Sequence, residues 1–144
     1  SSQNNLQTAG WHGVNERVGN SSWYDPAGQA DDWLISPQIA LPALSSGGYA
    51  LSYSVLSPDA NFANDYEILV STTGTSTSDF TSITSATPPS TESTKTADLS
   101  SYAGQSIYVA FRDVSNDKFT LYFDNVRELY LKILQWSNSF QNFC

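Results

Sequence analysis

The stretch Asp31-Asp32-Trp33-Leu34-Ile35-Ser36-Pro37 marks the point where the chain changes from loop-like to strand-like sequence. The run from Trp33 to Ser36 has the composition of a buried strand, and we expect Trp33 to lie in the core. Pro37 cannot donate to a β-ladder, so it belongs at a strand edge or a kink. Asp31 and Asp32 then lie where a loop enters a sheet, a place where carboxylates cap backbone groups, bind a cation or face solvent.

Segments with alternating large apolar residues follow this stretch. Strands are predicted at 49–55, 66–72, 106–112 and 119–124. The last two, separated by a short polar loop, are expected to form a hairpin. The Ser/Thr-rich residues 75–96 predict one weak strand and a surface loop. The residues expected to face inward are Tyr49, Leu51, Tyr53, Val55, Ile107, Val109, Phe111, Phe119, Leu121 and Phe123.

These segments indicate an all-β fold. Residues 1–30 favour short irregular strands joined by turns, and no segment before Glu128 combines a helical period with caps. Short strands at turn-punctuated spacing favour a sandwich of two antiparallel sheets over a barrel. A chain of 144 residues is the size of one domain, which we assign to residues 1–129. The pattern breaks in residues 130–144, which we interpret as a C-terminal strand, a linker or a non-native remnant.

Composition narrows the class of partner. The net charge is -8 and only 14% of residues are charged, so the surface is acidic and largely neutral-polar. A phosphate backbone would be repelled, and we expect no nucleic-acid partner. The excess of carboxylates suits Ca²⁺. Cys144 is the only cysteine, which rules out an internal disulfide and is more typical of a bacterial than an animal exported domain, and no apolar run is long enough to span a bilayer.

Catalytic patterns are weak. His12 is the only histidine, no Gly-x-Ser-x-Gly elbow is present, and one histidine with one terminal cysteine cannot form a zinc site. A glycosidase-type carboxylate pair is possible, but no spacing singles out two residues. We therefore expect no enzyme activity.

Aromatic residues in the Gly/Asn-rich segment are the candidates for ligand contact. Trp23 and Tyr24, followed by Trp11, can stack on sugar rings or on a partner surface. The alternative is that at least one tryptophan closes an end of the sandwich.

Four motifs in order carry a family resemblance. They are residues 31–37, residues 66–74 (YEILVSTTG) with Asp79-Phe80, residues 98–105 (DLSSYAGQ) leading into IYVAFR, and residues 123–126 (FDNV). Together they resemble the cleaved-adhesin family, the haemagglutinin-type or choice-of-anchor J modules of bacterial surface proteases, over residues 3–126. The resemblance implies a jelly-roll β-sandwich related to MAM and carbohydrate-binding modules. It also implies an exported, non-catalytic module that is often Ca²⁺-stabilised and attached to a larger secreted enzyme or adhesin.

The same resemblance implies a metal site. The family pairs an aspartate of the closing strand with oxygen ligands near the N-terminus, and the matching residues here are Asp124 with Gln3 and Asn4. Asp31, which precedes a strand, is a further candidate ligand.

The sequence thus predicts a calcium-stabilised recognition module, extracellular or at the cell surface, that binds carbohydrate or a host or matrix protein for a larger secreted protein. Two alternatives remain. A structural spacer would bury Trp23 and Tyr24, whereas a small polysaccharide-degrading enzyme would bring two carboxylates together in a groove.

Overall fold

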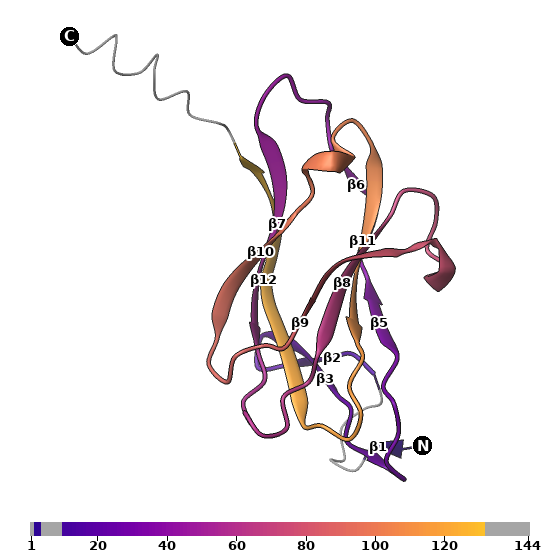
Figure 1. Ribbon diagram of the computed structural model, residues 1–144, viewed down its shortest axis with the longest axis vertical. Coiled ribbons are helices and arrows are strands. Elements are labelled where there is room, and N and C mark those ends of the chain that lie inside the picture. Colours follow the sequence, from indigo (N-terminus) through magenta and orange to yellow (C-terminus); the bar gives the residue numbers. More distant parts are fainter. Residues whose placement is uncertain (1, 4–9, 132–144) are drawn as a thin grey trace, which may run out of the picture.

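The computed structural model describes residues 2–3 and 10–131, which form two facing antiparallel sheets (Figure 1). One sheet has the strand order β10-β7-β12-β3-β2, and we call it the β12 sheet. The other, the β11 sheet, has the order β5-β11-β8-β9, with β6 also paired to β11, and the short strands β1 and β4 form a separate pair. The prediction of an all-β sandwich is confirmed. The strands are β1 (Ser2–Gln3), β2 (His12–Val14), β3 (Arg17–Ser21), β4 (Tyr24–Asp25), β5 (Asp32–Ile35), β6 (Ile39–Ala40), β7 (Gly48–Leu56), β8 (Tyr66–Ser71), β9 (Thr81–Ala86), β10 (Ser93–Asp98), β11 (Ser106–Asp113) and β12 (Thr120–Leu131), with single 3₁₀ turns at Thr77–Asp79 and Ser100–Tyr102.

The core lies between the sheets and consists of the residues that face inward at every second position along the strands. Phe123 of β12 has its ring centroid 4.4 Å from that of Phe111 on β11 and 5.2 Å from that of Tyr66 on β8. Tyr53 of β7 joins this aromatic cluster, 5.9 Å from Phe123. The period-two prediction is confirmed for nine of its ten inward residues, all buried: Tyr49, Leu51, Tyr53, Val55, Ile107, Val109, Phe111, Leu121 and Phe123.

The predicted hairpin between 106–112 and 119–124 is wrong. Strand β11 pairs with β5 and β8, whereas β12 pairs with β3 and β7, so the connection crosses from one sheet to the other. Alternation identifies the buried face of a strand but not its neighbour. Phe119 was expected to face inward, but it is 37% exposed, because it precedes β12 and lies in the connecting loop, where its N–H donates to the carbonyl of Phe62.

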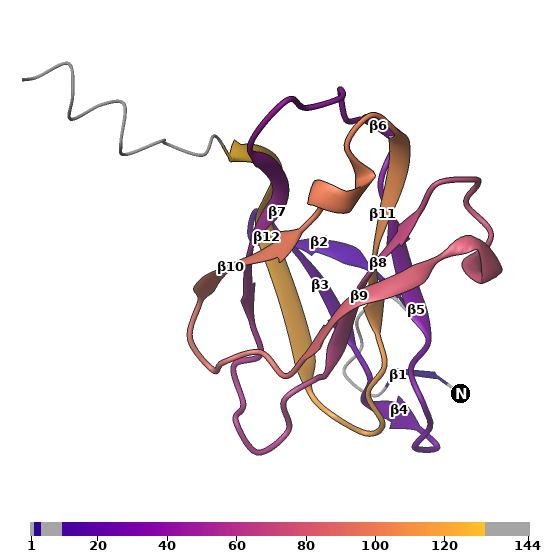
Figure 2. The same cartoon turned by 45° about the horizontal axis from the view of Figure 1, so that its top comes forward.

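Residues 75–96 contain a complete strand and part of a second, rather than one weak strand. Strand β9 pairs with β8 at the edge of the β11 sheet, and β10, which runs on to Asp98, pairs with β7 at the edge of the β12 sheet (Figure 2). Edge strands with one solvent-exposed face need few apolar residues. Here Ile83 and Ala86 of β9 and Ala97 of β10 contact the core. The low apolar content therefore hid their strand character.

Strand β5 is half-buried along its whole length instead of fully buried, because it lies at an edge of its sheet. Leu34 packs against the core, but Trp33 is only half-buried and stacks on Arg112 outside the sheet, so the expectation of a core Trp33 is wrong.

The predicted boundary at residue 129 falls within β12, which continues through Tyr130 and Leu131. Residues 132–144 and Asn4 lie outside the described residues, so the domain assignment and the interpretation of the tail stay predictions. In the described part of the chain, no helix is long and apolar enough to cross a membrane.

Replacing Phe123 with Ala should lower the free energy of unfolding by about 3–5 kcal/mol, because it leaves a cavity among aromatic rings from both sheets. Val126→Ala, at a position 46% exposed on the same strand, should change it by less than about 0.5 kcal/mol. Urea denaturation of both variants measures the difference, and equal effects would contradict this description of the core.

Candidate functional site

An aromatic pocket opens at the end of the sandwich where the β7–β8 and β11–β12 loops meet (the lower end in Figure 1). It has a volume of about 300 Å³. Its three aromatic side chains are substantially exposed: Trp23 by 41%, Phe62 by 52% and Phe119 by 37%. The lining residues, which define this aromatic pocket, are Trp23, Asp59, Phe62, Asp117, Lys118 and Phe119.

Backbone hydrogen bonds hold the aromatic residues in place. The Phe119 N–H donates to the Phe62 carbonyl over 2.9 Å, which joins the two loops. The Ser21 hydroxyl donates to the Phe119 carbonyl over 2.6 Å and accepts the Trp23 N–H over 3.2 Å. The Trp23 and Phe119 rings consequently meet edge to face, with centroids 6.2 Å apart. The pocket is therefore fixed by the fold rather than by contacts among exposed side chains alone.

The chemistry of the pocket combines aromatic faces with charged groups. Asp59, Asp117 and Lys118 supply hydrogen-bond acceptors and donors around the rings. Asp117 has φ 51°, a left-handed conformation that is uncommon for a residue other than glycine and concentrates at turns and functional sites. An apolar surface with a few convergent polar groups is the usual composition of a small-ligand site.

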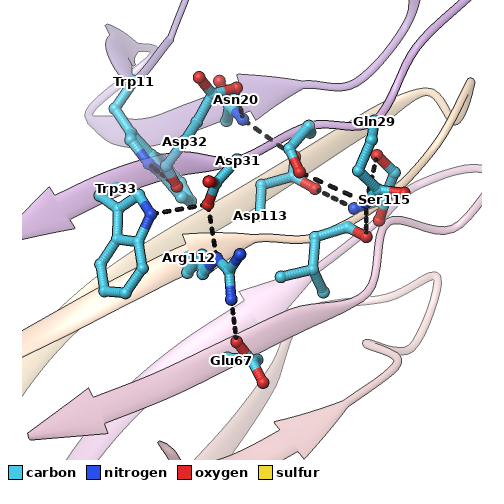
Figure 3. Close-up of polar contacts among 12 residues, drawn as sticks. Trp11, Asn20, Gln29, Asp31, Asp32, Trp33, Glu67, Arg112, Asp113 and Ser115 are labelled. Carbon is cyan, nitrogen blue, oxygen red and sulfur yellow. Dashed lines mark hydrogen bonds and ion pairs between the residues drawn. The ribbon is translucent and has the colours of Figure 1, made fainter. Parts of the chain in front are cut away.

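A buried polar cluster, formed by Asn20, Asp32, Asn64 and Asp113, lies at the same end of the sandwich. Asp32 and Asp113 are directly opposed in the β5–β11 ladder, and Asp113 is fully buried. The Asn20 amide nitrogen bridges them, 3.0 Å from Asp32 Oδ2 and 2.9 Å from Asp113 Oδ2 (Figure 3). Burial raises the pKa of Asp113, although hydrogen bonds from Asn64, Ser115 and Asn20 act in the opposite direction.

The cluster is connected to the aromatic pocket through Ser22. The Asn64 amide nitrogen donates to Asp113 Oδ2 over 2.8 Å and to Ser22 Oγ over 3.1 Å. Ser22 Oγ also accepts the backbone N–H of Lys118 over 3.1 Å. Because Ser22 precedes Trp23 and Lys118 precedes Phe119, the cluster positions backbone on both sides of the pocket.

Most of this site was not identified from the sequence. The alternation that places Phe111 and Leu34 inward also places Asp113 and Asp32 inward, two positions along each strand, and this signal was available. Asn64, Phe62 and Lys118 lie in loops, whose approach to other loops has no local sequence signal.

The three aromatic residues predicted for ligand contact have different environments. Trp23 lines the pocket. Tyr24 is partly buried, and its hydroxyl donates to Asp32 Oδ2 over 2.7 Å. Trp11 packs against the core 5.7 Å from the Phe123 ring, and its indole N–H donates to the Asp32 carbonyl over 3.1 Å. Trp11 thus belongs to the packing around the core, while closure of a sandwich end by a tryptophan and ligand contact by any of the three stay predictions.

Two of the predicted metal ligands, Asp31 and Asp124, lie on the outer faces of different sheets, and a third, Asn4, lies outside the described residues. Asp31 accepts hydrogen bonds from Arg112 Nε over 2.6 Å and Trp33 Nε1 over 2.7 Å on the outer face of the β11 sheet (Figure 3). Asp124 points to the outer face of the β12 sheet, where its Oδ1 accepts the N–H of Asn125. Gln3 lies on β1. Within residues 2–3 and 10–131, no three His, Cys, Asp or Glu side chains gather as a metal site. Calcium binding stays a prediction.

The two facing sheets define the class of fold: a β-sandwich of the kind found in adhesin domains and carbohydrate-binding modules. The family model described as Cleaved Adhesin Domain matches residues 1–127, and the chain belongs to that family. The resemblance stated from the sequence is confirmed.

Relatives and solved structures agree with this assignment. The K1 cleaved adhesin domain of Lys-gingipain from Porphyromonas gingivalis is 28% identical, with a TM-score of 0.68 over 88% of this chain and 87% of that chain. Hemagglutinin A of the same species is 28% identical over 147 residues, and the match covers 85% of this chain but only 7% of the relative. A CBM4 structure, 13% identical with a TM-score of 0.51 over 86% of this chain and 77% of that chain, shares the fold.

Arg112 anchors the outer face of the β11 sheet, since it bonds Asp31 and Glu67 and lies 5.0 Å from the centroid of the Trp33 ring. Arg112→Lys should lower the free energy of unfolding by about 1 kcal/mol, because a lysine cannot donate to both carboxylates while stacking on the indole. Arg17→Lys is the matched control, because Arg17 makes one exposed ion pair with Glu92. Thermal unfolding that shows equal losses would contradict a special role for Arg112.

Proposed function

We propose that this chain is a non-catalytic recognition module that binds carbohydrate in the aromatic pocket, at the outside or surface of the cell and as part of a larger exported protein. The observation that carries the proposal is the clustering of exposed aromatic residues. In the described part of the chain, six large hydrophobic residues are exposed, and Trp23, Phe62 and Phe119 all lie in one pocket. An exposed apolar patch bordered by polar groups is typical of an interaction site.

Carbohydrate fits the composition of this pocket. The apolar C–H face of a sugar ring can lie on an indole or phenyl face, while its hydroxyls exchange hydrogen bonds with carboxylate and ammonium groups. The pocket supplies the two kinds of surface within a single volume of about 300 Å³. Membership in the cleaved-adhesin family supports an adhesive role.

The two alternatives are less well supported. A structural spacer would bury both Trp23 and Tyr24. Tyr24 is half-buried, but Trp23 is 41% exposed, which favours recognition. Enzymatic hydrolysis would need a proton donor and a second carboxylate on either side of the scissile bond. In the pocket, one of the two carboxylates, Asp59, accepts the N–H of Asn61 in its own turn over 2.9 Å, which assigns it a structural use.

Trp23→Ala should weaken binding to a carbohydrate ligand at least tenfold, or about 1.4 kcal/mol, because it removes a stacking surface. The measurement is isothermal titration with ligands first selected from a panel of polysaccharides and matrix glycoproteins. Tyr130→Ala is the matched control, because Tyr130 is an exposed aromatic residue at 52% on the opposite end of the β12 strand. A panel without any ligand, or equal losses in the two variants, would contradict the proposal, and selection of only protein ligands would replace carbohydrate with a protein partner.

A further inference from the structure

A second recess lies on the outer face of the β12 sheet and shares no lining residue with the aromatic pocket. Tyr53 of β7 faces the core, so its neighbours Ser52 and Ser54 face outward. The recess has a volume of about 290 Å³. Its lining residues, which define the polar groove, are Ser52, Ser54, Thr94, Asn125, Val126 and Arg127.

A bulge in β12 shapes the polar groove. Asp124 is opposite Ser54 and Arg127 is opposite Ser52, so one extra residue is inserted into β12 between these pairs. In a regular ladder, position 126 would oppose Ser52 and Arg127 would point toward the core. The bulge therefore places the guanidinium on the outer face. Bulges that redirect a side chain in this way are over-represented beside active sites.

The floor of the groove carries two hydroxyls with little bonding inside the protein. Ser52 and Ser54 are only 4% and 5% exposed. Ser52 Oγ makes no hydrogen bond to another described residue, and Ser54 Oγ accepts only the Asn125 amide nitrogen, over a long 3.5 Å. Buried polar groups nearly always have a partner, and a hydroxyl can both donate and accept. The floor is thus suited to a ligand rich in hydrogen-bonding groups.

Arg127 gives the groove its positive charge. No ion pair formed by the described residues includes Arg127, whereas Arg17 and Arg112 have carboxylate partners. Asp124 is on the same face but does not line the groove, and its Oδ1 accepts the N–H of Asn125. A guanidinium matches the geometry of a carboxylate or another oxyanion through paired hydrogen bonds. Although the net charge of the chain is -8, this recess favours an anion.

We propose that the polar groove binds an acidic saccharide. Arg127 holds the carboxylate or sulfate of the sugar, while Ser52 and Ser54 exchange hydrogen bonds with its hydroxyls. None of the described lining residues is aromatic, so binding depends on hydrogen bonds and charge rather than on ring stacking. The proposal goes beyond the function proposed above, since it adds a second site on another surface with a different ligand requirement.

Isothermal titration with two matched pairs of oligosaccharides tests the groove. Trigalacturonate and its methyl ester differ in the charge of the carboxylates, and a κ-carrageenan oligosaccharide differs from its desulfated form by sulfate. At least one charged form should bind the wild-type protein at least tenfold more tightly than its uncharged counterpart. The form that binds identifies the anionic group, and added NaCl should weaken its binding.

Arg127→Gln should weaken binding of the charged form at least tenfold and abolish the preference over the uncharged form. Ser52→Ala should weaken binding severalfold without changing thermal unfolding, because Ser52 Oγ has no partner to lose among the described residues. Lys95→Gln is the matched control. It removes the same charge from the neighbouring strand, but Lys95 is the Cα partner of the inward Tyr53, so its side chain leaves the other face of β10 and binding should be retained.

A wild-type protein that binds neither charged form, or binds the charged and uncharged forms equally, would overturn the proposal. Equal losses in Arg127→Gln and Lys95→Gln would also overturn it, because they would show a general effect of net charge. Binding that is lost in Trp23→Ala and kept in Arg127→Gln would overturn it as well, and would assign the acidic saccharide to the aromatic pocket. Binding that is lost in Arg127→Gln and kept in Trp23→Ala supports the groove whether or not the aromatic pocket has a ligand, so the two proposals fail separately.

Discussion

The packing of Phe111 against Phe123, with ring centroids 4.4 Å apart, is the contact on which the other features of the structure depend. It sets which face of β11 and which face of β12 point inward, because successive side chains alternate across a strand. Two positions further along β11, the same alternation directs Asp113 into the interior, opposite Asp32. The connection from β11 to β12 then has to cross between the sheets at this end. The packing of Phe111 against Phe123 thus determines at which end of the sandwich the buried carboxylates and the β11–β12 connection lie.

The loops that form the aromatic pocket lie beside the buried carboxylates, and hydrogen bonds connect the two groups of residues. Asn64 bonds both Asp113 and Ser22, and Ser22 in turn accepts the Lys118 N–H. These hydrogen bonds restrain the backbone on both sides of the aromatic pocket. The exposed rings of the aromatic pocket are attached to that network through the backbone. Preorganised aromatic groups lose little conformational freedom when a ligand binds, which favours affinity in a shallow pocket.

The sequence predicted the fold class, the inward residues of β7 and β11, and the family, since all three depend on local patterns: period-two alternation and short ordered motifs. It did not predict that β11 and β12 belong to different sheets, because strand pairing depends on distant segments. It assigned the outward Trp33 to the core, because a short apolar run does not show whether a strand lies at an edge. Trp23 was selected for its neighbours in sequence, whereas Phe62 and Phe119 join it only through loop contacts. The inward orientation of Asp32 and Asp113 could have been predicted from the alternation along their strands, but their contacts with Asn20 and Asn64 could not.

The central claim is that a carbohydrate binds among Trp23, Phe62 and Phe119, and a two-dimensional ¹H–¹⁵N spectrum recorded during titration with a selected oligosaccharide tests it most directly. The account predicts the largest shift changes at the Trp23 indole N–H and at the backbone amides of Phe62, Lys118 and Phe119. The indole signals of Trp11 and Trp33, which are engaged with Asp32 and Asp31, should change little. Shift changes centred on Trp33 and the outer face of the β11 sheet, with the Trp23 signal unmoved, would contradict the account.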